Sequence, residues 1–541
     1  MFYQESETLL AKYPQYKDYI STLDKFLGNL SSSEGSQLNI EVVSDIVSVP
    51  IHVVEFIFDE YVKLGLLKKK NFLKCPVQGD LVVEIEEKDN FPIKTFCDIC
   101  GEEHSFNSED VVVRYCLVRF KKMEDKKEIN DALKYIPQSG TPISNNEIEN
   151  IRNSMPILMY LSSKTSVSKN ALLSGKRFII VLHFLKDLIP FMESCENLGL
   201  SPSETLMFYK KYLYPHKDQL ITYFKEKGYI IEPIESMDEA LSVFQEKSID
   251  SPKEIIVIED GGYIVPKLHG DFKELLKLTI GAIEQTTKGI REDERVKNLN
   301  FPVISVAQAE LKNRYEPPHV ARAVIHNIQT LLSEKSFSGK KALVIGYGAI
   351  GREIARQLRD ILKMIVTVYD INPNALLEAK NEGFITESIL TNAVKGKFLI
   401  IGATGQTSIG RAELLNMEHN TYLVSASSDQ REIGLIELES LAQDKKDIKM
   451  NDKKIGTKYI IRGTDKVINL LADGFPINFW ASNSIPNEVS DLIMSLIFVS
   501  LLYLTEYYRE LDNKIDSDIV NQLANEYEIA KIYLEYQEDK K

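Results

Sequence analysis

Residues 340–374 read KKALVIGYGAIGREIARQLRDILKMIVTVYDINPN, and this stretch decides the fold. An apolar segment, 342–345, leads into the turn GYGAIG at 346–351, and a helical pattern follows directly. A second apolar segment, 365–368, is followed by Asp370. This order of strand, glycine turn, helix, strand and acid is typical of the unit that binds a dinucleotide.

Each residue of this pattern has its own physical role. Gly346 permits the tight turn, Gly348 lets a pyrophosphate approach the backbone, and Gly351 lets the helix pack closely on the strand. The helix N-terminus offers free N–H groups and the positive end of its dipole. Asp370 would accept hydrogen bonds from an adenosine ribose and repel a 2′-phosphate, so we expect NAD rather than NADP. The alternative is a structural glycine turn in a sheet that binds no nucleotide.

The bulk composition limits the class of protein. At 541 residues the chain is too long for one hydrophobic core. A net charge of −14 argues against general binding to nucleic acid or to an anionic membrane. The longest apolar block, 492–504, is too short to span a bilayer and predicts a buried helix. The charged N-terminus is unlike a signal peptide, and five cysteines suit a reducing compartment. We therefore expect a cytoplasmic protein without a membrane segment.

Three regions are expected along the chain. They are a small unit at 1–120, an α/β domain made of 128–335 and 475–541, and a Rossmann-type NAD-binding domain at 336–474. The fold class is thus α/β, with the NAD-binding domain inserted in the second domain, because helices alternate with short apolar segments. The expected strands include 177–182, 229–231, 254–258, 398–401 and 422–424, and a helix is expected at 521–538.

The N-terminal unit has the order of elements found in a winged helix. Apolar residues at 40, 43, 46 and 47 have helical spacing, and a second helix is expected at 51–64 before a lysine-flanked strand. That second helix carries Glu55, Asp59 and Glu60 and no arginine, which is a poor surface for a phosphate backbone. Contact with a protein partner is the favoured role of this unit.

Four residues of the N-terminal unit form a candidate zinc set. They are Cys75, Cys97, Cys100 and His104, with Cys116 as the rival fourth ligand. Thiolates and imidazole in tetrahedral array suit zinc, and the spacing of Cys97 and Cys100 is that of a zinc knuckle. The alternative is a group of reduced cysteines in small strands.

Seven segments occur together in the order that one family shares. They are MPILM at 155–159, VLH at 181–183, EDGG at 259–262, IEQTTKG at 283–289, FPVISV at 301–306, GYGAIG at 346–351, and LLADG at 470–474 with SNS at 482–484. The stretch from about 155 to 500 resembles the S-adenosylhomocysteine hydrolase family. The second α/β domain is then its substrate domain.

The resemblance implies a reaction. In that family, tightly held NAD oxidises the 3′-hydroxyl of a nucleoside ribose, which acidifies the 4′ C–H; homocysteine is eliminated, water adds, and the hydride returns. By the same resemblance Lys312, Glu316, Asp260 and His183 are the expected catalytic residues. The resemblance also implies contacts to the cofactor from Thr286, Thr287 and Asn478, a nucleoside-like substrate, and a homo-oligomer.

The departures from the family pattern concern proton transfer. A glutamate of the family is Gln285 here, its third threonine is Lys288, one histidine position is Ser428, and the loop with a second histidine is shortened to 479–481. Serine and glutamine do not act as acid–base groups at neutral pH without help. The favoured hypothesis is therefore an NAD-dependent enzyme that reversibly oxidises a nucleoside-like ribose. The alternatives are a non-catalytic NAD or nucleoside sensor acting through the N-terminal unit, and an ordinary hydrolase with other groups in the missing roles.

Overall fold

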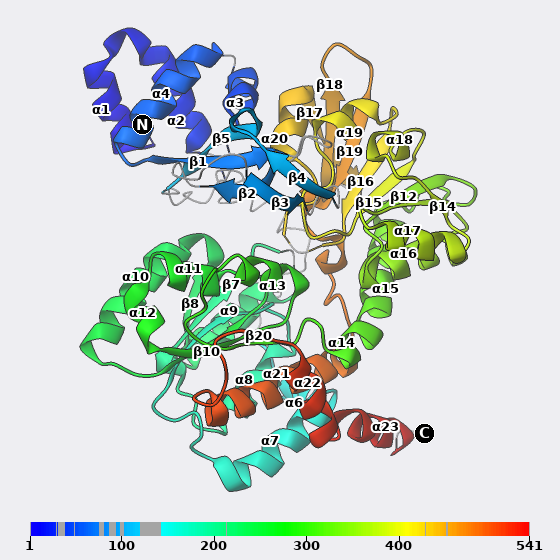
Figure 1. Cartoon of the computed structure of the whole chain (residues 1–541). Helices are drawn as coiled ribbons and strands as arrows, with labels where there is room; N and C mark the ends of the chain where they lie inside the picture. The colour runs from blue at the N-terminus through cyan, green and yellow to red at the C-terminus, as the bar shows by residue number, and fades with distance from the viewer. Residues whose placement is uncertain are drawn as a thin grey trace. The chain divides into compact units, whose positions relative to one another are not determined.

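The computed structural model describes residues 2–28, 30, 38–47, 49–74, 81–85, 93–97, 102–118, 142–212, 214–427, 429–450 and 453–539. The chain forms two compact units, whose elements are labelled in Figure 1. The first unit comprises Met1–Asp131 and Ser333–Pro476, and the second comprises Ala132–Leu332 and Ile477–Lys541. The chain therefore leaves the second unit to build the dinucleotide-binding fold and then returns to it.

The N-terminal part of the first unit is a helical layer beside a small sheet. Its helices are α1 (Gln4–Lys12), α2 (Lys17–Leu27), α3 (Ile40–Val47) and α4 (Ile51–Lys63). Its antiparallel sheet has the order β2 (Leu81–Ile85), β1 (Leu67–Lys74), β5 (Val111–Leu117), and β3 (Ile93–Cys97) pairs with β4 (Glu102–Phe106). On α4, Val54, Phe58 and Tyr61 are buried at helical spacing and join this core. The winged-helix interpretation of these elements stays a prediction.

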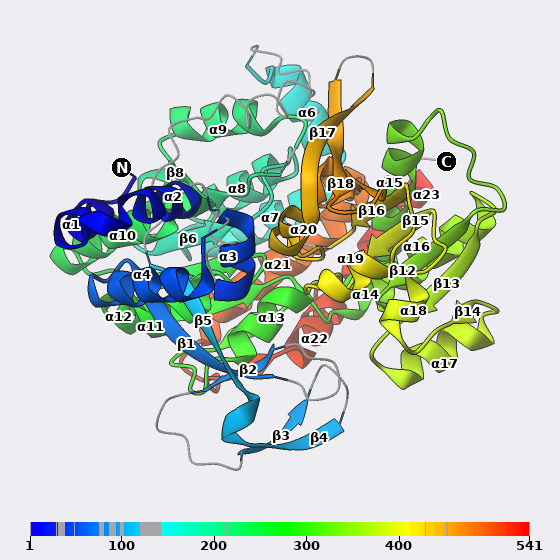
Figure 2. The same ribbon diagram turned by 90° about the horizontal axis from the view of Figure 1, so that it is seen from above.

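The rest of the first unit is an eight-stranded sheet of Rossmann type. The strand order is β14 (Ile385–Thr386), β13 (Ile365–Tyr369), β12 (Lys341–Ile345), β15 (Leu399–Gly402), β16 (Thr421–Ser425), β19 (Val467–Leu471), β18 (Lys453–Ile461) and β17 (Ala442–Met450). The first six strands are parallel, and β18 and β17 extend the sheet as an antiparallel hairpin, labelled in Figure 2. The helices are α16 (Ala349–Asp360), α17 (Pro373–Asn381), α18 (Leu390–Ala393), α19 (Arg411–Asn416) and α20 (Leu435–Leu441). The predicted strands at 398–401 and 422–424 are confirmed as β15 and β16.

The second unit is built on a fully parallel seven-stranded sheet. Its order is β20 (Ile515–Asp516), β11 (Val303–Ser305), β10 (Thr279–Glu284), β9 (Ile255–Glu259), β6 (Arg177–Val181), β7 (Thr205–Tyr209) and β8 (Ile230–Pro233). Every residue of β6, β9 and β10 is buried, which explains why the interiors of these strands are apolar instead of alternating, with charged residues only at strand ends. The predicted strands at 177–182, 229–231 and 254–258 are confirmed.

Helices accompany this sheet along the chain. Before the inserted domain they are α6 (Asn145–Asn153), α7 (Pro156–Lys169), α8 (Leu188–Glu196), α9 (Lys217–Glu226), α10 (Met237–Asp250), α11 (Ile264–Gly270), α12 (Lys273–Leu278), α13 (Thr287–Glu294), α14 (Glu310–Tyr315) and α15 (Pro317–Leu331). After the insertion they are α21 (Asn487–Tyr507), α22 (Asp518–Glu526) and α23 (Ile529–Asp539).

Helix α21 is the apolar block noted in the sequence. By length and composition it is the one helix among the described residues that could cross a membrane, but 89% of its most apolar window is buried inside the structure. Its Asp491 accepts the backbone N–H groups of Ile157 and Leu158 at 2.8 and 2.9 Å, at the start of α7. The prediction of a buried helix is confirmed.

Two local features were not foreseen from the sequence. The segment 521–538 is helical as predicted, but it is divided into α22 and α23, and Glu528 between them has φ of 51°, in the left-handed region. Helical spacing of apolar residues continues across such a break and does not reveal it. The hairpin β17–β18 was not expected, because β17 is rich in lysine and aspartate and mostly exposed.

Candidate functional site

The glycine turn lies between β12 and α16. Gly346 has φ of 93°, which favours glycine, and a Cβ there would lie 2.9 Å from the carbonyl oxygen of Ala403. At Gly351 a Cβ would lie 1.9 Å from the carbonyl oxygen of Gly346, so the helix packs directly on the turn. A Cβ at Gly348 meets no atom within 4 Å. Two glycines are thus required by packing, whereas the third borders open space.

Asp370 follows β13 and its carboxylate reaches back to this turn. It accepts the backbone N–H of Tyr347 at 2.6 Å and that of Asn372 at 2.8 Å. An ionised carboxylate offers about four lone-pair sites, so acceptor capacity for ribose hydroxyls remains. The acid and the glycine turn predicted from the sequence therefore lie together.

A buried glutamate that the sequence did not single out supports the facing loop. Glu432 accepts the N–H groups of Thr404 and Gly405 at 2.5 and 2.6 Å and the hydroxyl of Ser408 at 2.6 Å. Burial raises the pKa of this carboxyl, and its hydrogen bonds act in the opposite direction. The loop held by Glu432 follows β15, the strand beside β12. Strand order reverses between β12 and β15, which is where open α/β sheets bind ligands at their carboxyl ends. The residues present thus fit a dinucleotide.

In the second unit, a buried polar group lies at the corresponding edge of the seven-stranded sheet. Asp260 is 2% exposed, and its Oδ1 accepts a hydrogen bond from Lys210, whose side chain is 1% exposed. Its Oδ2 accepts from the amide of Gln285 and lies 3.2 Å from Nε2 of His183. These four residues, called here the Asp260 group, include two of the predicted catalytic residues.

The Asp260 group comes from the carboxyl ends of four neighbouring strands. His183 comes two residues after β6, and Lys210, Asp260 and Gln285 directly follow β7, β9 and β10. The order of the sheet reverses between β6 and β9, since the chain goes from β6 to β7 and β8 on one side and from β9 to β10 and β11 on the other. The group therefore lies at the switch point of this sheet, the expected position of a ligand.

Asp260 stays ionised in this setting. Burial alone would raise the pKa of its carboxyl, but the charges and hydrogen bonds of His183 and Lys210 hold it well below the usual value. Its charge is matched by the Lys210 ammonium, which donates a hydrogen bond to Oδ1 and holds the carboxylate in place. This arrangement suits the orientation of His183 and of a substrate hydroxyl better than proton transfer by Asp260 itself.

Three aromatic rings surround His183. The ring of Phe479 lies 4.4 Å from the imidazole between centroids, and those of Tyr212 and Tyr214 lie 5.6 Å from it. The Tyr214 hydroxyl also hydrogen bonds to Nδ1 of His183. Phe479 belongs to the segment 479–481, whose shortening was noted in the sequence. The shortened loop therefore places an aromatic side chain on the imidazole.

Lys312 and Glu316 form an ion pair at the end of α14. The Lys312 ammonium donates to the Glu316 carboxylate, and the two side chains are 11% and 21% exposed. Their separation of four residues places them on one side of a helical turn. A lysine paired with a carboxylate can exchange a proton with a nearby hydroxyl, and the catalytic role of this pair stays a prediction.

The predicted cofactor contacts in the second unit have structural roles. Thr286 caps α13 by accepting the N–H of Gly289 at 3.0 Å, and its hydroxyl donates to Glu284 at 2.6 Å. Thr287 is the first residue of α13. The amide nitrogen of Asn478 donates to Ser484 at 2.9 Å, whereas its buried Oδ1 has no hydrogen-bond partner among the described residues. Contacts of these residues to a nicotinamide stay a prediction.

Most of the candidate zinc set lies outside the described residues. This is true of Cys75 and Cys100, and of the side chain of Cys97 on β3. His104 lies on β4, with its ring 5.7 Å from that of Phe106. Ser428, at the position of a missing histidine, is also outside the described residues. The zinc hypothesis is neither supported nor opposed by the described part of the chain.

Lys210 is the residue of the Asp260 group that sequence reasoning missed. The signal was present, because the apolar strand TLMFY at 205–209 precedes it and the carboxyl end of a parallel strand is a frequent place for a functional residue.

Comparison with known proteins agrees with this geometry. Residues 321–484 match the family model described as S-adenosyl-L-homocysteine hydrolase, NAD binding domain. The adenosylhomocysteinase of Aquifex aeolicus is 26% identical over 371 residues, covering 67% of this chain and 84% of that protein. That of Thermotoga maritima is 30% identical over 312 residues, covering 55% and 73%. The S-inosyl-L-homocysteine hydrolase of Methanopyrus kandleri is 28% identical over 295 residues, covering 52% and 67%.

In two other relatives the match spans 63% and 64% of their length. A dipicolinate synthase chain of Bacillus halodurans is a more distant structural neighbour, with 13% identity, a TM-score of 0.37, and coverage of 61% of this chain and 99% of that one. The family model and the Thermotoga relative, together with the NAD-type turn, show that the chain belongs to the adenosylhomocysteinase family.

Proposed function

We propose that this protein is an NAD-dependent enzyme that reversibly oxidises the ribose 3′-hydroxyl of a purine nucleoside, free or linked to a thiol through its 5′ carbon. The observation that supports this most directly is the Asp260 group, buried at the switch point of the second sheet. The relatives are named for S-adenosyl- and S-inosyl-homocysteine, which differ in the base and share the ribose and the thioether. The ribose is therefore the part of the substrate to which we assign the shared chemistry.

Each residue has a role in the proposal. Bound NAD supplies the acceptor for the hydrogen of the ribose C3′. The Lys312–Glu316 pair takes the proton of the 3′-hydroxyl, because a lysine beside a carboxylate can hold or release one. The Asp260 group orients the sugar through His183 and Lys210, whose positions are fixed by the carboxylate between them. Phe479 and the tyrosines beside His183 exclude water from the imidazole.

Complete hydrolysis of adenosylhomocysteine is not included in the proposal. Elimination and hydration need groups that take and return protons, and Gln285 is bound as a donor to Asp260 and cannot exchange one. The proposed activity is therefore the oxidation and its reversal. Release of free homocysteine would extend the activity to the complete reaction of the relatives.

The test uses the purified full-length chain. Bound dinucleotide is identified by mass spectrometry, and adenosine, inosine or S-adenosylhomocysteine is then added while the absorbance band of reduced nicotinamide is followed. We expect a rise that is lost in Lys312→Ala and kept in Arg314→Ala. Arg314 is a matched control because it lies on the same helix and is 73% exposed.

Two results would contradict the proposal. One is tightly bound NAD that none of the three nucleosides reduces, which would instead favour the sensor hypothesis. The other is a rise of equal size in Lys312→Ala and the wild type, which would remove Lys312 from the reaction.

A further inference from the structure

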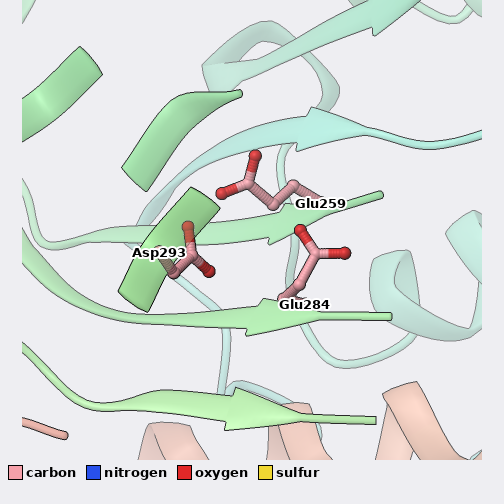
Figure 3. A group of neighbouring side chains, drawn as sticks. All are labelled: Glu259, Glu284 and Asp293. Atoms are coloured by element: carbon pink, nitrogen blue, oxygen red, sulfur yellow. The ribbon is translucent and has the colours of Figure 1, made fainter. Parts of the chain in front are cut away.

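A cluster of three buried carboxylates lies next to the Asp260 group, because two of its members directly precede Asp260 and Gln285 in the chain. Glu259 and Glu284 are the last residues of β9 and β10, and Asp293 lies on α13. All three side chains are 0% exposed, and an oxygen atom of each lies within 4.8 Å of the others. Figure 3 shows the three groups gathered around one space. We call them the carboxylate cluster.

Two members of the cluster are held by donors that favour the ionised form. Glu259 accepts three backbone N–H groups, those of Tyr263, Ile264 and Val265 at 2.6, 2.8 and 3.1 Å. Glu284 accepts the N–H groups of Gly261, Gly262 and Thr286 and the hydroxyl of Thr286, at 2.6 to 3.1 Å. A carboxylate that accepts several N–H groups is stabilised in its charged state.

Asp293 has the opposite environment. Both of its carboxylate oxygens are buried without a hydrogen-bond partner among the described residues. The same is true of the hydroxyl of Ser305, which pairs in register with Glu284 in the parallel ladder and so shares its face of the sheet. Buried polar atoms nearly always have a partner, which can be an ion. The carboxylate of Asp293 and the hydroxyl of Ser305 therefore lie beside the carboxylates of Glu259 and Glu284, which their hydrogen bonds hold in place.

The charge of the cluster points to a cation of charge two. Burial raises the pKa of Glu259, whereas its backbone hydrogen bonds and the charge of Lys288 act in the opposite direction. When a bound ion keeps all three carboxyls ionised, Lys288 balances one of their three negative charges and leaves two. Burial, followed by repulsion from neighbouring carboxylates, raises the pKa of Glu284 to about 8 and that of Asp293 to about 10, so protons are the alternative neutralising species. A cation, unlike a proton held by one carboxyl, would also take the lone pair of the Ser305 hydroxyl oxygen.

We propose that Glu259, Glu284, Asp293 and Ser305 form a binding site for a hard divalent cation, of the class of Mg²⁺, Mn²⁺ and Ca²⁺. These ions take oxygen ligands, and calcium–oxygen distances of about 2.3–2.6 Å place opposite ligands at most about 4.6–5.2 Å apart. The three carboxylate oxygens, all within 4.8 Å of one another, are close enough to bind one calcium ion together. Magnesium, with distances of about 2.0–2.1 Å, would draw the carboxylates slightly inward.

Binding would fix the residues that carry the Asp260 group. Glu259 and Glu284 precede Asp260 and Gln285 directly, and their side chains hold the loops that follow. In this proposal the cation fixes the loops that carry Asp260 and Gln285, and it is not a ligand of the substrate. Its presence does not depend on the proposed reaction and is tested without measuring activity.

The experiment measures thermal unfolding of the full-length chain after treatment with a chelator. Mg²⁺, Mn²⁺ and Ca²⁺ are titrated separately, with KCl of equal ionic strength as the control for salt. At a hundredfold excess over the dissociation constant, the bound ion should raise the midpoint by about 2 to 5 °C, according to whether the whole chain or the second unit alone unfolds in the transition. The ion that acts at the lowest concentration identifies the preferred metal.

Two variants make the test specific. Asp293→Asn keeps the shape and removes one charge, so we expect it to fold with a midpoint at least that of the metal-free wild type and to lose the response to all three ions. Glu294→Gln, an exposed neighbour on α13, should respond like the wild type. Ser305→Ala keeps the three carboxylates and should weaken binding several-fold. Unchanged wild-type midpoints with every ion, or an equal shift in Asp293→Asn, would overturn the proposal.

Discussion

Replacing two glycines of the turn should separate NAD binding from folding. An alanine Cβ at Gly351 would lie 1.9 Å from the carbonyl oxygen of Gly346, far inside any allowed contact, so α16 or the turn would have to move by about an ångström. We expect Gly351→Ala to lower the free energy of unfolding by about 3 kcal/mol, the upper end of overpacking costs. At Gly348 the Cβ meets no atom within 4 Å, and φ of −71° with ψ of −170° suits alanine.

Gly348→Ala should therefore leave the NAD-free protein as stable as the wild type, or more stable by about 0.4–1 kcal/mol. It should weaken NAD binding at least about tenfold, because the added methyl group occupies the space through which the pyrophosphate approaches the backbone. Urea unfolding of the NAD-free proteins and calorimetric titration with NAD measure the two effects. Wild-type stability in Gly351→Ala, or wild-type affinity in Gly348→Ala, would refute this description of the turn.

Three substitutions test the second unit. Lys210→Met leaves the buried Asp260 carboxylate without its ammonium partner, and should lower the free energy of unfolding by about 3 kcal/mol in urea; a loss below about 1 kcal/mol would contradict the pairing. Burial opposes ionisation of Glu204, but its hydrogen bond with the fully buried Arg177 lowers its pKa to about 2 from 4.5. The stability that this carboxylate contributes is present above pH 4.5 and is lost as the pH falls toward 2. In Glu204→Gln this loss of stability between pH 4.5 and 2 should be absent, as measured by urea unfolding at a series of pH values. Burial raises the pKa of Asp491 from 3.8 to about 7, so the wild type should lose stability as the pH rises from about 4 to 7 because the unfolded chain ionises first. In Asp491→Asn that slope should be absent, and an unchanged slope would mean that Asp491 does not titrate in this range.

The local parts of the fold could be predicted from the sequence. The glycine turn and Asp370 lie within one βαβ unit, where spacing alone brings them together. His183 and Asp260 were expected from the family resemblance, and the apolar runs before them predicted the strands that they follow. These are short-range patterns, and they do not require knowledge of which strands are neighbours.

The remaining features depend on contacts between distant segments. Lys210 reaches Asp260 only because β7 is next to β6, and Asp293 joins Glu259 and Glu284 only through the packing of α13. The spacing of apolar residues along the chain reveals neither which strand is next to β7 nor where α13 packs. The partner of the N-terminal unit, zinc binding and a homo-oligomer stay predictions, since they concern side chains outside the described residues or other molecules.

The most direct test of the central claim follows a hydrogen atom. Adenosine labelled with deuterium at C3′ is mixed with the purified protein under single-turnover conditions, and the bound dinucleotide is released and weighed by mass spectrometry. We predict that the reduced dinucleotide carries one deuterium, and that adenosine labelled at C2′ or C5′ transfers none. Reduction without deuterium, or no reduction of the bound dinucleotide at all, would contradict reversible oxidation at the 3′ position.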